Sequence, residues 1–314
     1  MRVAALCGGV GAAKLLPGLE AVLPGRLLSA IVNVGDDCEL HGLAISPDLD
    51  TITYTVAGAV NPGTGWGLAD ESWATMQAMR RFARVVPRGS AAGATWFNLG
   101  DRDLATHLYR TGRRAEGAPL SQVTLEVAAA FGVGFRLLPA TDDRLRTFLV
   151  VDGREVDFQE WFVGRRHQGS VSSVRFEGAD TATPAPGVLE ALTEADRVVV
   201  CPSNPVVSIG PLLAVAAIRR VLEERRADVV AVSPIVDGAA LKGPAASLLA
   251  DLGHEVSPVG VARLYRDFAS ALVIDEVDAG LAGDVEAEGV RAIVAPTVMH
   301  DLATAEAVAR VVLG

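Results

Sequence analysis

Two acidic segments near the start of the chain could hold a metal ion. Residues 33–37 (NVGDD) and 46–51 (SPDLDT) place the carboxylates of Asp36, Asp37, Asp48 and Asp50 within fifteen positions, in loops bounded by glycine or proline. Mg²⁺ binds well to one or two carboxylates combined with substrate phosphates. Loop aspartates also cap helices and turns, and this is the role that we favour for Asp37 and Asp48.

A glycine-rich turn, residues 8–14 (GGVGAAK), follows the first apolar run. Gly8, Gly9 and Gly11 would let the backbone approach phosphate oxygens, and a following helix offers free N–H groups and a positive dipole end. Lys14 adds a positive charge one turn later. The turn matches neither GxGxxG nor GxxxxGK[ST], so we expect no dinucleotide cofactor. A purely structural turn stays open as the alternative to phosphate binding.

Two further segments carry polar side chains in compact patterns. In residues 96–107 (WFNLGDRDLATH), Asp103 and His107 are one helical turn apart, which suits a metal pair or a plain i,i+4 contact. Because no further ligand lies nearby in the sequence, we expect structural pairing. In the segment PSNP, Ser203 and Asn204 stand between prolines and could present hydrogen-bonding groups to a nucleotide.

Short β-branched runs alternate with stretches of helical spacing. The expected strands are residues 2–7, 29–33, 197–201, 228–232 and 271–275, and the expected helices are 13–22, 73–82, 104–112, 120–131, 207–226, 240–252 and 303–312. This alternation predicts an α/β, Rossmann-like fold with a mostly parallel sheet and helices on both faces. Ligands bind such sheets at the carboxyl ends of the strands, so the segments GGVG, VGDD, PSNP and SPIV should converge on one crevice.

Residues 137–186 have a different pattern. Apolar alternation at 148–151, an Asp-Gly pair at 152–153 and a second run at 156–163 predict a β-hairpin, and residues 170–176 continue the alternation. We interpret 137–186 as a β-rich insertion in an α/β core formed by residues 1–136 and 187–314. Residues 86–94 (VPRGSAAGA) are expected to form a small-residue surface loop.

The composition argues against several classes of protein. The 314 residues are 50% apolar, and 38 acidic against 28 basic side chains give a net charge of −10. Nucleic acid is therefore not an expected partner, because its binding requires a basic surface. No apolar run approaches the ~18 residues of a membrane span, so no membrane is expected either. Three scattered cysteines, Cys7, Cys38 and Cys201, are typical of reduced thiols in a cytoplasmic protein.

Taken together, the motifs resemble the 2-phospho-L-lactate transferase family. The segments GGVGAAKLLPGL, NVGDD, SPDLDT, NLGDRDLATHLYRTG, DFQEWFV, PSNPVVSIGP and SPIVDG followed by KGPA occur in the family's order over nearly the whole chain. Family members act in biosynthesis of the deazaflavin coenzyme F(420). They transfer phosphoenolpyruvate or 2-phospho-L-lactate from a guanosine-diphosphate-linked donor to the terminal hydroxyl of 7,8-didemethyl-8-hydroxy-5-deazariboflavin (Fo) and release GMP. The resemblance implies a transferase with these small-molecule substrates.

The resemblance also implies roles for particular residues. Asp36 and Asp50 would be catalytic and would hold Mg²⁺, and Asp50 would be either a metal ligand alone or also the group that orients or deprotonates the attacking hydroxyl. The implied substrate-binding residues are Gly8, Gly9, Gly11 and Lys14 for phosphate, Ser203 and Asn204 for the nucleotide, and Asp50, Trp66 and Asn98 near Fo. Trp96 is a further candidate for the Fo site, with core packing open for both tryptophans. Asn98 stands where some archaeal members have a basic residue.

Several points stay open at the level of sequence. The donor could carry a lactyl, enolpyruvyl or glyceryl group; the alanine- and arginine-rich composition, typical of a high-GC bacterium, slightly favours enolpyruvyl, the group of actinobacterial members. The oligomeric state, with a homodimer as one option, is not defined. A non-catalytic α/β regulator that binds a sugar nucleotide is the alternative function. The segments LGDRDLATH and SPDLDT favour the enzyme, because they belong to the deazaflavin side of the family pattern.

Overall fold

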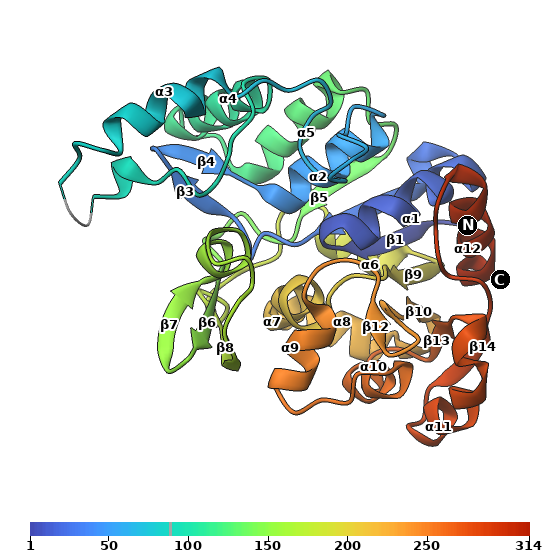
Figure 1. Cartoon of the computed structure of the whole chain (residues 1–314). Coiled ribbons are helices and arrows are strands. Elements are labelled where there is room, and N and C mark those ends of the chain that lie inside the picture. Colours follow the sequence, from blue (N-terminus) through green and yellow to red (C-terminus); the bar gives the residue numbers. More distant parts are fainter. Residues whose placement is uncertain (88–89) are drawn as a thin grey trace.

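The main sheet of the computed structural model, which describes residues 1–87 and 90–314, is parallel throughout (Figure 1). Its seven strands lie in the order β14-β13-β10-β9-β1-β2-β5. They are β1 (Val3–Cys7), β2 (Leu28–Val32), β5 (Arg136–Pro139), β9 (Arg197–Val200), β10 (Val229–Val232), β13 (Ala271–Ile274) and β14 (Arg291–Val294). The predicted α/β, Rossmann-like class is confirmed, although the sequence patterns had identified only five of these strands.

The winding of the chain changes direction beside β1. Strands β1, β2 and β5 follow one another toward one edge, and the chain then crosses back to add β9, β10, β13 and β14 on the other side of β1. The loops after β1 and β9 therefore diverge, and such a switch point is where ligands bind in open α/β sheets. At this point the backbone N–H of Gly8 donates to Ser203 Oγ at 3.2 Å.

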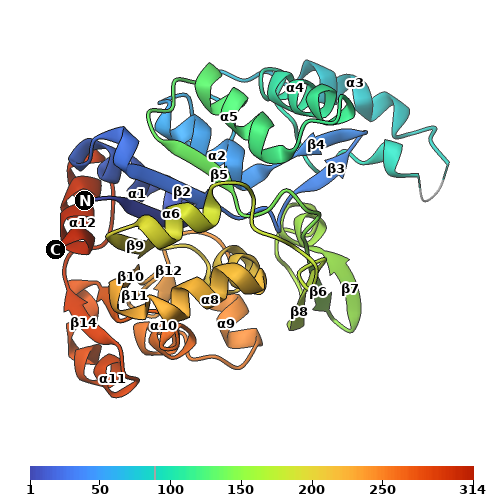
Figure 2. The same ribbon diagram turned by 180° about the vertical axis from the view of Figure 1, so that it is seen from behind.

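Helices cover both faces of the sheet, as predicted. Helix α1 packs against α12 on one face, and α6 packs against α8 on the other (Figures 1 and 2). The helices are α1 (Gly9–Val22), α2 (Pro47–Val56), α3 (Ala74–Phe82), α4 (Asp103–Ala115), α5 (Leu120–Ala130), α6 (Val188–Glu194), α7 (Gly210–Ala214), α8 (Ala216–Glu224), α9 (Ala245–Asp251), α10 (Pro258–Tyr265), α11 (Ala282–Ala287) and α12 (Leu302–Leu313). No single described helix is long and apolar enough to cross a membrane; only α7 and α8 with the turn before them, bent by 95°, pass that test as a pair.

The β-rich segment forms a three-stranded antiparallel sheet of β6 (Arg146–Val151), β7 (Arg154–Asp157) and β8 (Val171–Glu177). The predicted hairpin turn is present: Asp152 and Gly153 have φ of 49° and 78°, as a two-residue type I′ turn requires. Strand β7 ends earlier than expected because the Asp157 side chain accepts from the backbone N–H of Gln159, which starts a helical turn over Glu160–Gly164. The expected boundary is also corrected, since residues 137–139 belong to β5 of the main sheet.

Residues 46–51, which we interpreted as a loop, contain the start of helix α2. Ser46 precedes Pro47, and proline at the first helical position is already in a helical φ. Asp48 and Asp50 occupy the first turn, where the helix dipole favours negative charge. Both carboxylates are therefore held on a helix. The expected helix over 207–226 is likewise corrected, because extended backbone at Val215 separates α7 from α8.

A second hydrophobic cluster joins the insertion to the main domain. Trp161, which is almost fully buried, packs there with Leu149 and Phe158 of the insertion and with Val207 and Leu248 of the main domain, whereas a much larger cluster surrounds the main sheet. Two short antiparallel pairs complete the fold: β3 (Cys38–Leu40) with β4 (Leu43–Ile45), and β11 (Ile235–Val236) with β12 (Ala239–Ala240). Within the expected surface loop 86–94 a short 3-10 turn covers Ala91–Gly93, and residues 88 and 89 lie outside the described residues.

Gly11 lies where helix α1 approaches the loop after β9. A Cβ atom at this position would stand 1.9 Å from the carbonyl oxygen of Pro202, which is backbone and has little freedom to move. We expect Gly11→Ala to lower the free energy of unfolding by about 2 kcal/mol or more, measured by urea denaturation. The matched control is Gly112→Ala in α4, where a Cβ meets nothing within 4 Å and should stabilise by about 0.5–1 kcal/mol. Similar effects of both substitutions would contradict the close approach.

Candidate active site

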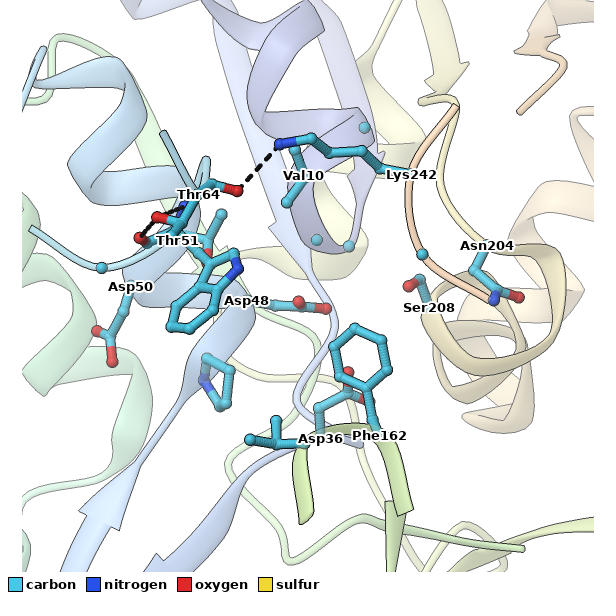
Figure 3. Close-up of a pocket in the computed structure, with 18 of the residues that line it drawn as sticks. Val10, Asp36, Asp48, Asp50, Thr51, Thr64, Phe162, Asn204, Ser208 and Lys242 are labelled. Carbon is cyan, nitrogen blue, oxygen red and sulfur yellow. Dashed lines mark hydrogen bonds between the residues drawn. The ribbon is translucent and has the colours of Figure 1, made fainter. Parts of the chain in front are cut away.

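The crevice at the switch point opens into a cavity of about 800 Å³ (Figure 3). Residues after β1, β2, β9 and β10 line it, so the four strand-end segments converge as predicted. The cavity is also lined by every residue that we assigned to the site: Gly8, Gly9, Gly11, Lys14, Asp36, Asp50, Trp66, Asn98, Ser203 and Asn204. One cavity therefore unites the glycine-rich turn, the acidic segments and Trp66.

Asp36 and Asp48 share one hydrogen-bond donor at the floor of the cavity. Asn33 Nδ2 donates to Asp36 Oδ1 at 3.1 Å and to Asp48 Oδ2 at 3.0 Å, and all three residues are buried. Burial and the charge of Asp48 raise the pKa of Asp36, and burial raises the pKa of Asp48 to about 6. Two buried carboxylates with one neutral donor between them lack positive charge, which a cation would supply.

Asp50 is paired with a cation of helix α4. Arg110 Nη1 donates to Asp50 Oδ2 at 3.1 Å, and Arg110 Nη2 donates to Asp50 Oδ1, so the guanidinium binds both oxygens. His107 Nδ1 lies 3.7 Å from Asp50 Oδ2, and His107 Nε2 lies 3.3 Å from Asp103 Oδ2. Tyr54 donates to Asp103 Oδ1 at 2.5 Å. The expected Asp103–His107 contact is thus present, but it is one part of a network that surrounds Asp50.

Two sets of side chains at the cavity could bind a metal ion, and they differ in the charges around them. Oxygen or nitrogen atoms of Asp50, Asp103 and His107 all lie within 4.8 Å of one another, which is close enough to hold one ion. Asp36 and Asp48 provide a second pair of oxygen donors. Oxygen-rich sites suit Mg²⁺, whereas the imidazole of His107 suits transition metals better. These ligands therefore fit a divalent cation. Asp50 is already paired with Arg110, whereas Asp36 and Asp48 have no positively charged side chain as a partner among the described residues.

The N-terminus of helix α1 already binds one carboxylate. Gly9, with φ of 62°, donates its backbone N–H to Asp48, which opposes the effect of burial on the pKa of that side chain. Lys14 lies one turn further along and donates to the carbonyl oxygen of Met299 at 3.2 Å. Burial and the charge of Lys242 lower the pKa of Lys14. Two cations that repel each other across the cavity create a position for an anion.

Ser203 and Asn204 are both partly committed to the structure. Ser203 Oγ accepts from Gly8, and Asn204 Oδ1 accepts from the backbone N–H groups of Val206 and Val207, which caps the following helical turn. Asn204 Nδ2 is buried and has no hydrogen-bond partner among the described residues. A buried amide donor without a partner is costly unless a ligand or water accepts from it. Asn204 therefore has one free donor for a ligand.

The two tryptophans proposed for the Fo site have different surroundings. Trp66 is half exposed and lines the cavity together with Phe97 and Asn98. Trp96 is not a lining residue; its ring packs edge-on against Phe97 at 5.8 Å, within the small cluster around Leu99. Of the two open roles for Trp96, the structure supports packing.

Several lining residues had no site role assigned to them from the sequence, although KGPA, which contains Lys242, belongs to the family pattern. Lys242 donates to the carbonyl oxygen of Thr64 at 3.0 Å and so links two loops across the cavity (Figure 3). The insertion contributes a second group, Phe158, Gln159, Phe162, Val163, Arg166 and His167. The motif DFQEWFV had been noted only as part of a hairpin and of the family pattern. Its position beside a cavity depends on how the insertion packs on the core, which no local pattern encodes.

A carboxylate-lined cavity at the switch point of a Rossmann-like sheet, with a glycine-rich turn and lysines for an anion, is typical of an α/β protein that binds a small-molecule ligand. The family model described as 2-phospho-L-lactate transferase CofD matches residues 3–309. The chain therefore belongs to the CofD family of 2-phospho-L-lactate transferases and is a transferase of coenzyme F(420) biosynthesis.

Curated relatives agree over almost the full length. The chain is 41% identical over 315 residues to a phosphoenolpyruvate transferase of Streptomyces griseus, covering 99% of this chain and 96% of the relative. It is 42% identical over 313 residues to the phosphoenolpyruvate transferase of Kitasatospora aureofaciens, with 98% and 95% covered. A solved structure from Bacillus halodurans, of the UPF0052 family, is 17% identical with a TM-score of 0.63 over 100% of both chains, which is a likeness of fold. Membership in a transferase family favours the enzyme over a regulator.

Asp37 gives a pH dependence that can be measured on the ligand-free protein. It accepts from Ser46 Oγ at 2.6 Å, but its Oδ1 is buried without a partner among the described residues, and burial raises the pKa of Asp37 to about 8. Between about pH 4 and pH 8 the native state therefore holds a proton that the unfolded chain has released. As the pH rises through this window, the contribution of Asp37 should lower the free energy of unfolding by about 1.4 kcal/mol per pH unit.

The measurement is urea denaturation in EDTA at pH 5 and pH 7, with Asp37→Asn as the variant. The variant should lose this contribution, so its stability should fall less with pH than that of the wild type. Asp36 and Asp48 remain in both proteins, and the charge of Asp37 also raises the pKa of Asp36, so the difference between the two profiles reports Asp37 together with this effect. Parallel pH profiles would mean that Asp37 is not protonated in the native state.

Proposed function

We propose that the protein transfers a phospho-organic acid from a guanosine-diphosphate-linked donor to the terminal hydroxyl of Fo and releases GMP. The observation that carries this proposal is one cavity that buried carboxylates, two lysines and aromatic side chains line together. Gly9, Lys14 and Lys242 offer groups for an anion, and the same cavity is lined by Trp66, Phe97 and Asn98. Lys242 donates to the carbonyl oxygen of Thr64, so it adjoins the loop that carries Trp66. The names of the relatives, phosphoenolpyruvate transferases, support an enolpyruvyl donor.

In the proposed reaction, the hydroxyl oxygen of Fo forms a bond to the phosphorus that carries the organic acid. The bond from this phosphorus to the bridging oxygen breaks, and GMP leaves with that oxygen. The proton of the hydroxyl passes to Asp50 or to water. A carboxylate has about four acceptor positions, two on each oxygen. Arg110 donates to one position on each Asp50 oxygen. Each oxygen therefore keeps one acceptor position for the hydroxyl or for a metal.

The divalent cation of the proposal, Mg²⁺, would be held by Asp36 and Asp50, with Asp48 beside them and donor phosphates completing the set. It would neutralise negative charge on the phosphate oxygens. The chain's own groups then bind and orient: Lys14 and Lys242 attract the diphosphate, and the free Nδ2 of Asn204 donates to the nucleotide. Arg110 binds both oxygens of Asp50 and so fixes the orientation of this carboxylate.

The direct test is incubation of the purified protein with Fo, Mg²⁺ and one synthetic donor at a time, with products identified by mass. We expect a (dehydro) coenzyme F(420)-0 product and GMP in equal amounts with at least one of the lactyl, enolpyruvyl and glyceryl donors. Absence of transfer with all three donors would overturn the proposed function.

Turnover should require a divalent cation and the Asp50 carboxylate. Excess EDTA should abolish product formation, because two lysines do not neutralise a diphosphate that carries a further carboxylate. Asp50→Asn should reduce kcat by about a hundredfold or more while GDP affinity, measured by calorimetry, changes by less than about threefold.

The matched comparison for Asp50→Asn is Asp48→Asn in the same helical turn, with thermal unfolding of both variants. Removal of the Asp50 charge leaves Arg110 buried and unpaired, so a loss of stability in Asp50→Asn alone is anticipated. Equal losses of kcat and of GDP affinity would limit Asp50 to binding, and full turnover in EDTA would remove the metal from the mechanism.

The enzyme should accept more than one donor. Lactyl and enolpyruvyl groups differ by two hydrogens and by the planarity of one carbon, and an apolar pocket separates such groups by about 1–3 kcal/mol, or roughly 10–200-fold. We therefore expect turnover of both, with enolpyruvyl preferred. Competition of the two donors in one reaction measures the ratio. A second product below about one part in a thousand would show discrimination by a polar contact instead.

A further inference from the structure

The segment that follows the helical turn of the insertion holds two side chains on strained backbone at the cavity. Arg166 and His167 are consecutive, are not glycine, and have φ of 53° and 47°. Left-handed backbone costs an ordinary residue roughly 1–2 kcal/mol. Such residues persist where the surrounding structure imposes them, and they gather at functional sites.

Hydrogen bonds on both sides of this pair hold it in place. Arg165 N–H donates to the carbonyl oxygen of Glu160 at 2.8 Å, and His167 N–H donates to that of Trp161 at 2.9 Å. The indole Nε1 of Trp161 donates to the carbonyl oxygen of Gln168 at 3.1 Å. Because Trp161 is anchored in the cluster that joins the insertion to the main domain, the strained segment has a fixed position on the cavity wall.

Arg166 is a cation without a partner in the described residues. Three other arginines of the insertion are paired, Arg165 with Glu160, Arg146 with Asp157 and Arg175 with Glu155. Arg154, which does not line the cavity, makes no ion pair among the described residues. Arg166 makes no ion pair and no hydrogen bond through its side chain within residues 1–87 and 90–314, yet it lines the cavity. An unpaired guanidinium at a strained position in an acidic protein is suited to an anionic group of a ligand.

The adjoining wall is apolar and is linked to the reacting centre. Phe158 and Phe162 stack with ring centroids 5.4 Å apart, and both line the cavity. Gln159 Nε2 donates to the backbone carbonyl oxygen of Asp36 at 3.4 Å, which ties the insertion to the metal-binding segment. Figure 3 shows Phe162 on the side of the cavity where Asp36 lies, away from Lys242. A phosphorus bound at Asp36 would therefore have these rings beside it.

We propose that the insertion binds the organic acid of the donor, with Arg166 pairing its carboxylate and Phe162 contacting its carbon skeleton. This inference rests on the proposed function. The transferred group has one carboxylate on a three-carbon skeleton, and the insertion's part of the cavity lining includes one fork-shaped cation, Arg166, and the apolar ring of Phe162. Lys14 and Lys242 lie with the glycine-rich turn and remain for the diphosphate.

The test compares two donors and three variants. The donors are the enolpyruvyl compound and guanosine diphosphate esterified with ethanol, which keeps the diphosphate and lacks the carboxylate. Arg166→Asn removes the guanidinium and keeps a residue that tolerates left-handed backbone. Arg166→Lys keeps the charge without the fork. Arg165→Asn, one residue away and paired with Glu160, is the matched control.

Wild type should prefer the enolpyruvyl donor by about a hundredfold in kcat/KM. In Arg166→Asn, kcat/KM for the enolpyruvyl donor should fall by about a hundredfold, mainly through a higher KM. For the ethyl donor it should fall by less than about threefold, so the preference between the donors disappears. Arg166→Lys should fall between them, and Arg165→Asn should match the wild type. Thermal unfolding of all variants identifies any loss of folded protein.

Equal losses with both donors in Arg166→Asn would overturn the inference, since they would indicate a diphosphate contact or a structural role, and so would an unchanged preference. A wild type that turns over no donor would instead contradict the proposed function. In that case calorimetric titration with the two donors still decides on Arg166, because binding of the carboxylate does not require transfer.

Discussion

Buried negative charge at one end of a parallel sheet is the constraint on which this site depends. Asp36, Asp48 and Asp50 are each about 5–6% exposed, yet only Asp50 has a cation partner of its own among the described residues, Arg110. Burying an unpaired carboxylate is expensive, and the raised pKa values of Asp36 and Asp48 are the result. The same carboxylates are proposed to hold a metal beside a diphosphate, and a cation bound there would favour their charged forms. Ligand binding and the stability of this region are coupled through the same charges.

The fold distributes the cost of this charge over several elements. The winding of the sheet places the loop after β2 and the first turns of α1 and α2 around one point, so that Gly9 and Asn33 donate hydrogen bonds to Asp48. Gly11 lets α1 approach the loop after β9, which keeps Ser203 against Gly8. The glycines are therefore structural as well as close to the cavity. Part of the N-terminus of α1, which we expected to face phosphate, is occupied by a protein carboxylate.

Local pattern and the geometry of parallel sheets account for the features that could be predicted from the sequence. Parallel strands make four strand-end loops converge, and the Asp-Gly hairpin results from the backbone that a two-residue turn requires. The start of α2 could also have been predicted, since Ser-Pro before acidic residues is a helix signal, but we interpreted it as a loop. Arg110, sixty residues from Asp50, and the aromatic wall of the insertion depend on tertiary packing. No spacing in the chain encodes those contacts.

The insertion is joined to the main domain next to the site. The cluster around Trp161 also contains Val207 and Leu248 of the main domain, and Gln159 Nε2 donates to the backbone carbonyl oxygen of Asp36. Substitutions that disturb Trp161 should therefore also affect the segment that holds Asp36. Arg166 is different, because its side chain is exposed and makes no ion pair or hydrogen bond among the described residues. If the organic acid is bound there, as we propose, a substitution at Arg166 changes the choice of donor with little effect on the arrangement of the buried carboxylates.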